Sequence, residues 1–338
     1  MINKKDQNKK VEKKLKLLSL FSGIGAFEEG LKNLGVDYDL INYCEFDKPI
    51  AKAYSLIHNV DETLNLGDIT KVNEKELEDF DLMTYGFPCQ SFSVMGKRLG
   101  FDDKEKGNLF FESMRIVKYK KPKFLIAENV KGLTHHNKGN TFETIIKTLE
   151  YLGYNNYYKV LRSSDFDIPQ ERERIFIVSI RKDIDNNKFV LPEGKPTNKT
   201  LKDIIEINAD RKQPKGSLMK YLNPIYFKEY KSNGNIKKLF DGNVQGYFTS
   251  GFSLNRIYSI NGTSPTLTTY NDTVYYEING HLTQRERFKL QGFNPDYVDL
   301  LLKNGISKGY IDKMSGNSIT VNVIQAILKN LLLSYEYI

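Results

Sequence analysis

The octapeptide at positions 86–93 holds a cysteine, Cys89, directly after a proline in a short polar segment. The preceding run from Asp81 to Tyr85 reads as a buried strand, and a strand ends where glycine and proline follow it. The thiol is therefore expected at the carboxyl end of a strand, where open α/β sheets build their sites. A thiol there can act as a nucleophile if its pKa is lowered, although a free cysteine is more often a small buried apolar residue.

Two further segments could assist such a thiol. Glu128 follows an apolar run, so it also lies at a strand's carboxyl end, where burial can keep a carboxyl protonated and able to donate a hydrogen bond. Gln170, Arg172 and Arg174 alternate just before another apolar strand, which places them on one face. Two arginines on one face suit contacts with anions or carbonyls. The plainer alternatives are a surface acid after a strand and a solvated, charged strand edge.

A third constellation predicts a bound cofactor. Residues 17–25 read as a strand, a Gly-x-Gly turn and a helix start, where glycines allow close approach and free N–H groups face a ligand. Glu45 lies 20 residues after Gly25, where an acid pairs with ribose hydroxyls in dinucleotide-binding folds. Position 28 is Glu rather than the third glycine of that fingerprint, and Asp68 after a third expected strand could accept from an adenine amino group. The set favours S-adenosylmethionine over NAD, and the alternative is three ordinary strand-end turns.

The elements that must position these residues alternate between strand and helix from Leu15 to about Arg181. This alternation indicates a mostly parallel sheet covered on both faces. The expected strands are Leu15–Phe21, Leu40–Cys44, Leu82–Tyr85, Phe124–Ala127, Tyr157–Leu161 and Ile175–Ile180, and the expected helices are Ala26–Leu34, Pro49–His58, Leu109–Lys118 and Phe142–Leu152.

The character of the chain changes at about Arg181. Residues 181–280 hold 15 Lys and Arg against 10 Asp and Glu, with scattered aromatics and no strand–helix alternation. This part is expected to form a second domain of short strands and loops. A helical pattern returns at Leu282 and includes a helix at Val321–Leu333. We therefore expect domains at 1–181 and 182–281, with residues 282–338 returning to the first domain.

Composition narrows the class of protein. A chain of 338 residues with 40% hydrophobic residues can bury a sizeable core and favours two domains. The net charge of +8 favours a polyanionic partner. Two cysteines, Cys44 and Cys89, indicate no disulfide framework and a reducing cytoplasm. No apolar run is long enough to span a bilayer, the lysine-rich start has no signal-peptide pattern, and no zinc-ligand spacing occurs, so no metal is expected.

The motifs stand in the order seen in DNA (cytosine-5)-methyltransferases of the prokaryotic restriction-modification type, which the chain resembles outside about residues 185–250. They are Phe21-Ser-Gly-Ile-Gly25, Gly86-Phe-Pro-Cys-Gln90-Ser-Phe-Ser93, Glu128-Asn-Val130, Gln170-x-Arg172-x-Arg174, Arg256-Ile-Tyr258, Ser264-Pro-Thr-Leu-Thr268 and Gly316-Asn-Ser318. The resemblance implies a Rossmann-like α/β sheet that uses S-adenosylmethionine, with a smaller, mostly irregular and β target-recognition domain at 182–281.

The resemblance also implies a role for each matched residue. Cys89 would attack ring carbon 6 of a cytosine, Glu128 would hydrogen-bond ring nitrogen 3 and the exocyclic amine, and Arg174, supported by Arg172, would contact the 2-carbonyl oxygen. The base must be flipped out of the duplex to reach the thiol, and residues 90–107 resemble the loop that closes over it. Cofactor binding would fall to Phe21, Gly23, Ile24, Gly25, Glu45, Asp68, Ile69, Asn317 and Ser318.

The expected partner is double-stranded DNA, bound by a monomer, with a cognate restriction endonuclease acting on the same site as a candidate partner. A tRNA cytosine-5 methyltransferase of the same family has the same chemistry, but the separate basic segment of about 70 residues favours DNA. An NAD-dependent dehydrogenase is disfavoured by the missing third glycine. An inert DNA-binding regulator is disfavoured because Cys89, Glu128 and Arg174 are all present.

Overall fold

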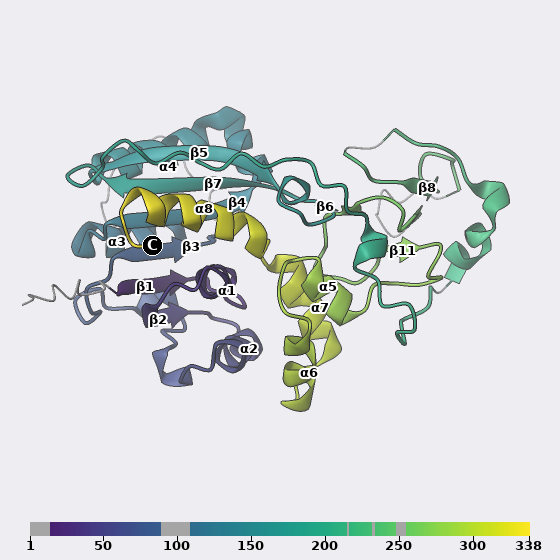
Figure 1. The fold of residues 1–338 in the computed structure, drawn as a ribbon, viewed down its shortest axis with the longest axis horizontal. Helices are drawn as coiled ribbons and strands as arrows, with labels where there is room; N and C mark the ends of the chain where they lie inside the picture. Colours follow the sequence, from purple (N-terminus) through teal and green to yellow (C-terminus); the bar gives the residue numbers. More distant parts are fainter. Residues whose placement is uncertain (1–13, 89–108, 215, 232–233, 248–254) are drawn as a thin grey trace, which may run out of the picture.

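The computed structural model describes residues 14–88, 109–214, 216–231, 234–247 and 255–338. Figure 1 shows a larger lobe built on a central sheet and a smaller lobe of short strands. The central sheet has six strands in the order β2-β1-β3-β4-β7-β5. Its strands are β1 Leu15–Leu20, β2 Tyr38–Cys44, β3 Leu82–Tyr85, β4 Phe124–Val130, β5 Tyr154–Arg162 and β7 Glu173–Arg181. Strands β1 to β4 are parallel, whereas β7 runs antiparallel to both neighbours.

Helices cover both faces of this sheet, as the sequence predicted. Alternate residues of β4 divide between two cores: Leu125 and Ala127 pack with helices α3 and α4, and Phe124 and Ile126 pack with α1 and α8. Burial of these apolar side chains is the main force that holds the layers together. The helices of the larger lobe are α1 Ala26–Asn33, α2 Lys48–His58, α3 Leu109–Lys120, α4 Asn140–Tyr151 and α8 Val321–Ser334. No helix within the described ranges is long and apolar enough to cross a membrane.

Two expectations about the sheet need correction. Strand β4 continues to Val130, so Glu128 lies inside the strand rather than after it, because β7 keeps pairing as far as Arg174 opposite Val130. The prediction that Asp68 follows a strand of its own is also wrong, because the segment before Asp68 makes only an isolated bridge between Tyr43 and Asn65. Both residues nevertheless reach the same end of the sheet as the end of β1.

The smaller lobe has short strands and loops, as expected from its composition. A three-stranded sheet joins β8 Lys238–Asp241, β9 Arg256–Tyr258 and β11 Val274–Tyr275. Strand β10 Ser264–Pro265 pairs with β6 Gln170–Glu171, next to the central sheet. The domain boundaries at 181 and 281 stay predictions.

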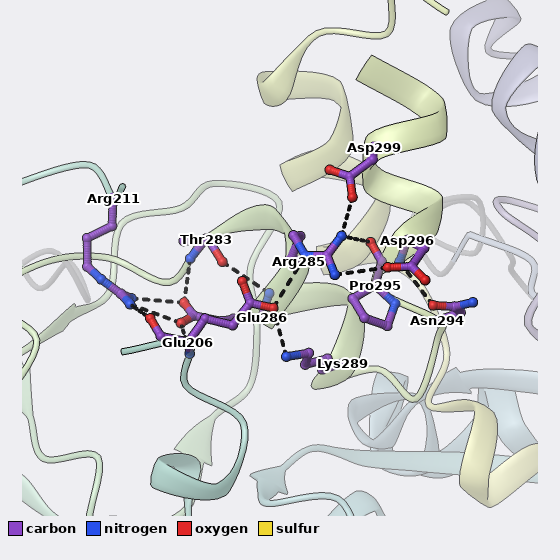
Figure 2. A network of polar contacts seen from close by, with 10 residues as sticks. All are labelled: Glu206, Arg211, Thr283, Arg285, Glu286, Lys289, Asn294, Pro295, Asp296 and Asp299. Atoms are coloured by element: carbon purple, nitrogen blue, oxygen red, sulfur yellow. Dashed lines mark hydrogen bonds and ion pairs between the residues drawn. The ribbon is translucent and has the colours of Figure 1, made fainter. Parts of the chain in front are cut away.

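Three helices lie between the lobes in Figure 1: α5 Gln284–Lys289, α6 Asp296–Lys303 and α7 Lys308–Asn317. Figure 2 shows the polar network that joins α5 to the segment around Arg211. The buried Glu286 carboxylate accepts from Arg211 Nη1 at 3.0 Å, from its Nη2 at 3.1 Å, and from the backbone N–H of Glu206 at 2.8 Å. Glu206 in turn binds Arg285 and Lys289 of the same helix. Helix α5 is thus fixed to residues 206–211 by charge.

Candidate active site

A cavity of about 890 Å³ opens at the carboxyl ends of β1 to β4. It brings together most of the predicted site residues: Phe21, Gly23, Ile24, Glu45, Asp68, Ile69, Glu128, Arg172, Arg174, Asn317 and Ser318. Gly25 is not among its lining residues. Pro88 also lines it, whereas Cys89 and the loop 90–107 lie outside the described residues.

The two glycines in the turn after β1, Gly23 and Gly25, have different surroundings. Gly23 has φ +56°, and a Cβ added there would meet no atom within 4 Å, so the backbone borders open space. Gly25 has φ +77°, and its added Cβ would lie 2.0 Å from His58 Nε2. That ring nitrogen lies 3.0 Å from the carbonyl oxygen of Ile24. Gly23 can therefore admit a ligand, whereas Gly25 allows close packing of α2 behind the turn.

The carboxylate of Glu45 is fixed at the end of β2. Its Oε2 accepts the backbone N–H of Gly23 at 3.1 Å, and its Oε1 accepts that of Asp47 at 2.9 Å. Burial raises the pKa of Glu45, and these two bonds oppose the rise. The next residue, Phe46, lines the cavity with 76% of its surface exposed. An exposed ring on a cavity wall suits stacking against a flat ligand, and the sequence reasoning missed it.

Asp68 and Cys44 lie at the same end of the sheet, but their pKa values shift in opposite directions. Asp68 begins a short 3₁₀ turn, where its Oδ1 accepts from Thr70 N at 3.1 Å and from Thr70 Oγ1 at 2.8 Å. These bonds lower the pKa of Asp68, so it remains an ionised acceptor. The Cys44 thiol donates to Gly67 O, and burial raises its pKa to about 12, which makes Cys44 a poor nucleophile.

An ion pair spans β4 and β7 at the other side of the cavity. Arg174 Nε lies 3.0 Å from Glu128 Oε1, and both side chains are largely buried. Burial raises the pKa of Glu128, while the charges of Arg174 and Arg172 oppose that rise. Glu128 therefore retains a proton more readily than an ordinary glutamate and can donate it to a base.

Arg172 binds backbone carbonyl groups in the C-terminal part of the chain. Its guanidinium donates to Leu267 O at 3.3 Å, Gly316 O at 3.0 Å and Ser318 O at 2.6 Å. An added Cβ at Gly316 would lie 2.1 Å from Thr268 O, so only glycine fits there. Arg172 thus holds the Gly316–Ser318 wall of the cavity in place.

Asn129 anchors the segment that leads to Cys89. Its Nδ2 donates to the carbonyl oxygen of Phe87 at 2.7 Å, and its Oδ1 accepts from the backbone N–H of Val130 at 2.8 Å. Asn129 stands in the quoted Glu-Asn-Val motif, but the sequence reasoning gave it no role. The bond fixes the chain two residues before the cysteine.

Comparisons with known proteins identify the relatives of this chain. The family model for C-5 cytosine-specific DNA methylase matches residues 15–333. The orphan methyltransferase M.SPRI of Bacillus phage SPR is 41% identical over 283 residues, which cover 76% of this chain and 64% of that enzyme. The chain spans 36% of a second phage relative, M.Rho11sI of Bacillus phage rho11s. The type II methyltransferase M.HhaI of Haemophilus parahaemolyticus is 33% identical, with 94% of each chain covered.

Solved structures share the fold. The Dnmt2 methyltransferase of S. pombe superposes with a TM-score of 0.69 at 21% identity, covering 96% of this chain and 99% of its own. A putative DNA modification methyltransferase encoded within an E. coli prophage gives 0.66 at 20% identity, covering 95% of this chain and 99% of its own. The match of nearly the whole chain to the family model, together with 33% identity to M.HhaI over 94% of each chain, shows that this protein belongs to the C-5 cytosine-specific DNA methylase family.

Proposed function

We propose that this protein transfers a methyl group from S-adenosylmethionine to carbon 5 of a flipped-out cytosine in a specific duplex DNA sequence, through a covalent Cys89–cytosine intermediate. The observation that carries the proposal is that one cavity is lined both by residues suited to bind the cofactor and by residues suited to activate a cytosine. Glu45, Phe46 and Asp68 lie along it, and so do the Glu128–Arg174 pair and Pro88, the neighbour of Cys89.

The cofactor side of the cavity fits an adenosine ligand. Gly23 leaves open space beside the backbone, and the exposed Phe46 ring offers a stacking surface. The carboxylates of Glu45 and Asp68 are acceptors of the kind that ribose hydroxyls and an amino group need. Bound S-adenosylmethionine would supply an electrophilic methyl group. Asn317 and Ser318 would close the site from the C-terminal side.

The catalytic side fits activation of a cytosine. The Cys89 thiolate would form a bond to ring carbon 6 while protonated Glu128 donates to ring nitrogen 3 and Arg174 donates to the 2-carbonyl oxygen. Carbon 5 thereby becomes electron-rich and would form the bond to the methyl group, while the broken sulfur–methyl bond leaves its electron pair on S-adenosylhomocysteine. A base then removes the carbon-5 proton, and the electron pair expels the thiolate and restores the ring.

The smaller lobe is the proposed reader of the DNA target. Its lysines suit phosphates, and its Asn, Gln and Arg side chains suit base edges. We propose that the protein binds duplex DNA as a monomer. The word orphan in the name of M.SPRI argues against a cognate endonuclease for that relative, and we propose the same independence here.

Methyl transfer from tritiated S-adenosylmethionine to duplex DNA and to tRNA tests the proposal directly. We expect label on carbon 5 of DNA cytosines, and we expect Cys89→Ser to retain less than about a hundredth of the rate because a hydroxyl is a far poorer nucleophile at neutral pH. Label on tRNA alone would instead support the RNA-directed reading.

A trapping experiment separates the two cysteines. In the presence of S-adenosylmethionine, duplex DNA with 5-fluorocytosine at the target keeps the enzyme attached, because after methyl transfer fluorine cannot leave carbon 5 as the proton does. We expect an adduct that survives denaturation with the unaltered protein and with Cys44→Ser, and none with Cys89→Ser. An adduct that persists in Cys89→Ser would contradict the assignment of the nucleophile.

A further inference from the structure

The cofactor cavity has two walls that come from distant parts of the chain. One is the turn between β2 and α2, which carries Glu45 and Asp47. The other is α7 with its C-terminal end at Gly316–Ser318. Asp47 and Lys313 both line the cavity, one on each wall, and their side chains meet: Lys313 Nζ lies 2.6 Å from Asp47 Oδ2.

Asp47 stands at the start of α2, where an aspartate side chain normally caps the helix. It is the N-cap residue of α2, and an N-cap carboxylate usually accepts from backbone N–H groups of the helix's first turn. Here the side chain makes no capping bond, and Oδ2 faces Lys313 instead. The other oxygen, Oδ1, is buried and has no hydrogen-bond partner. A buried acceptor without a partner is unfavourable, so helix stability does not account for this orientation.

The ion pair is part of a chain of contacts around the cavity. The backbone N–H of Asp47 donates to Glu45 Oε1, and the backbone N–H of Gly23 donates to Glu45 Oε2. Lys313 is therefore linked through Asp47 to Glu45, and through Glu45 to the turn after β1. The side chains of Lys313 and Asp47 are 43% and 24% exposed, and an ion pair at such a rim adds little to folding stability.

We propose that Asp47 and Lys313 are positioning residues that join the two cavity walls at the rim, hold the Glu45 carboxylate in its binding orientation, and slow cofactor release. This inference rests on the proposed function, because it takes S-adenosylmethionine as the ligand. The pair acts through Glu45 and α7 and does not itself take part in methyl transfer.

Binding measurements without DNA test the pair apart from catalysis. Lys313→Met, Asp47→Asn and the double variant are compared by calorimetry for the dissociation constant of S-adenosylmethionine and by stopped flow for its dissociation rate. We expect each single variant to weaken binding roughly three- to tenfold, in the lower part of the range of coupling within one hydrogen-bonded network, mainly through faster release. The double variant should be no weaker than the singles, and Lys313→Arg should restore most of the affinity.

Lys308→Met is the matched control, since it removes the same charge from the same helix outside the cavity. It should change the dissociation constant by less than twofold, and the melting temperatures of all ligand-free variants should agree. Additive losses in the double variant, or unchanged affinity in Lys313→Met, would overturn the proposed pair while leaving the proposed function intact. Failure of the unaltered protein to bind S-adenosylmethionine would overturn both.

Discussion

Individual side chains around the cavity are set to different protonation states by their surroundings. Burial raises the pKa of Glu128 and of the Cys44 thiol, which shifts both groups toward the protonated form. The bonds from Thr70 lower the pKa of Asp68, which favours the ionised form. Under the proposed function, Glu128 donates a proton to a base while Asp68 accepts from the cofactor. Separation of acid and acceptor roles by environment is typical of active sites.

Glu128→Gln tests the proton on this carboxyl. An amide can donate a hydrogen bond to ring nitrogen 3 but cannot give up a proton, so we expect kcat/KM to fall by about 10²-fold. The raised pKa means that Glu128 stays protonated to higher pH than usual and loses this proton as pH rises through its pKa. That alkaline decline should appear in the unaltered protein and be absent in Glu128→Gln. Parallel pH profiles of kcat/KM for the two proteins would contradict the role.

Glu45→Ala and Asp68→Ala test the two proposed cofactor acceptors. Loss of a hydrogen bond to a charged group costs about 1.5–3 kcal/mol, roughly ten- to hundredfold in affinity for S-adenosylmethionine. We expect the larger loss for Glu45→Ala, because it also leaves the backbone N–H groups of Gly23 and Asp47 without their acceptor. Calorimetry gives both constants. Tight binding of NAD and none of S-adenosylmethionine would reverse the cofactor assignment.

Among individual residues, those within strong motifs could be predicted from the sequence, whereas those defined by contacts with distant parts of the chain could not. Glu45 directly follows a predicted strand, at the spacing from Gly25 expected of a ribose-binding acid, so its position could be predicted. Asp68 was expected after a strand that does not form, yet it lines the same cavity. Phe46 carried a weak signal, an aromatic residue beside a predicted ribose-binding acid. Nothing in the sequence pairs Asp47 with Lys313, because 266 positions separate them and only the return of the C-terminal segment brings α7 to β2.

Among the elements, helix α5 joins the smaller lobe to α7, which lines the cavity, through two successive residues. Glu286 binds Arg211 in the segment before the smaller sheet. The next residue, Arg287, donates to Thr268 O at 2.6 Å and to Ser315 Oγ of α7 at 2.9 Å. A helix with two such contacts fixes how the lobes are placed around the cavity.

Glu286→Gln is expected to destabilise the fold strongly. The change leaves the 6%-exposed Arg211 without its ionic partner, and removal of one member of a buried pair costs about 3–5 kcal/mol. Asp299→Asn is the control, because Asp299 binds Arg285 at the exposed edge of the same network in Figure 2, where a pair contributes about 0–1 kcal/mol. Urea unfolding measures both. Equal effects of the two changes would show that the Arg211–Glu286 contact is not the anchor.

Element positions could be predicted better than element lengths and directions. The strand–helix alternation placed the strands of the central sheet, because apolar runs and breakers mark them. The antiparallel direction of β7 follows from the short link of residues 163–172 after β5, since a parallel return needs a crossover of about a dozen or more residues. The length of β4 depended on its pairing with β7, which no local pattern shows.

For the whole molecule, the segment proposed to read DNA belongs partly to each lobe. Phe189 and Leu191 pack in the core of the larger lobe, and Arg211 is bound to α5. Beyond them, Phe240 and Ile257 form a separate small core with Val274. Lys238 is already paired with the buried Asp241 at 2.7 Å, so part of the positive charge here supports the fold rather than DNA.

These contacts define how a specificity exchange should be made. We predict that residues of about 185–255 set sequence choice, because base-edge contacts carry the information whereas phosphate contacts hold register. A graft of residues 216–255 from a relative with another target keeps the larger-lobe core and the Arg211–Glu286 contact. It should move the methylated site, read by bisulfite sequencing of a plasmid, while the rate on the new site stays within about tenfold. A chimera that is active yet still methylates the original site would place recognition outside this segment, with the loop 90–107 as the next region to exchange.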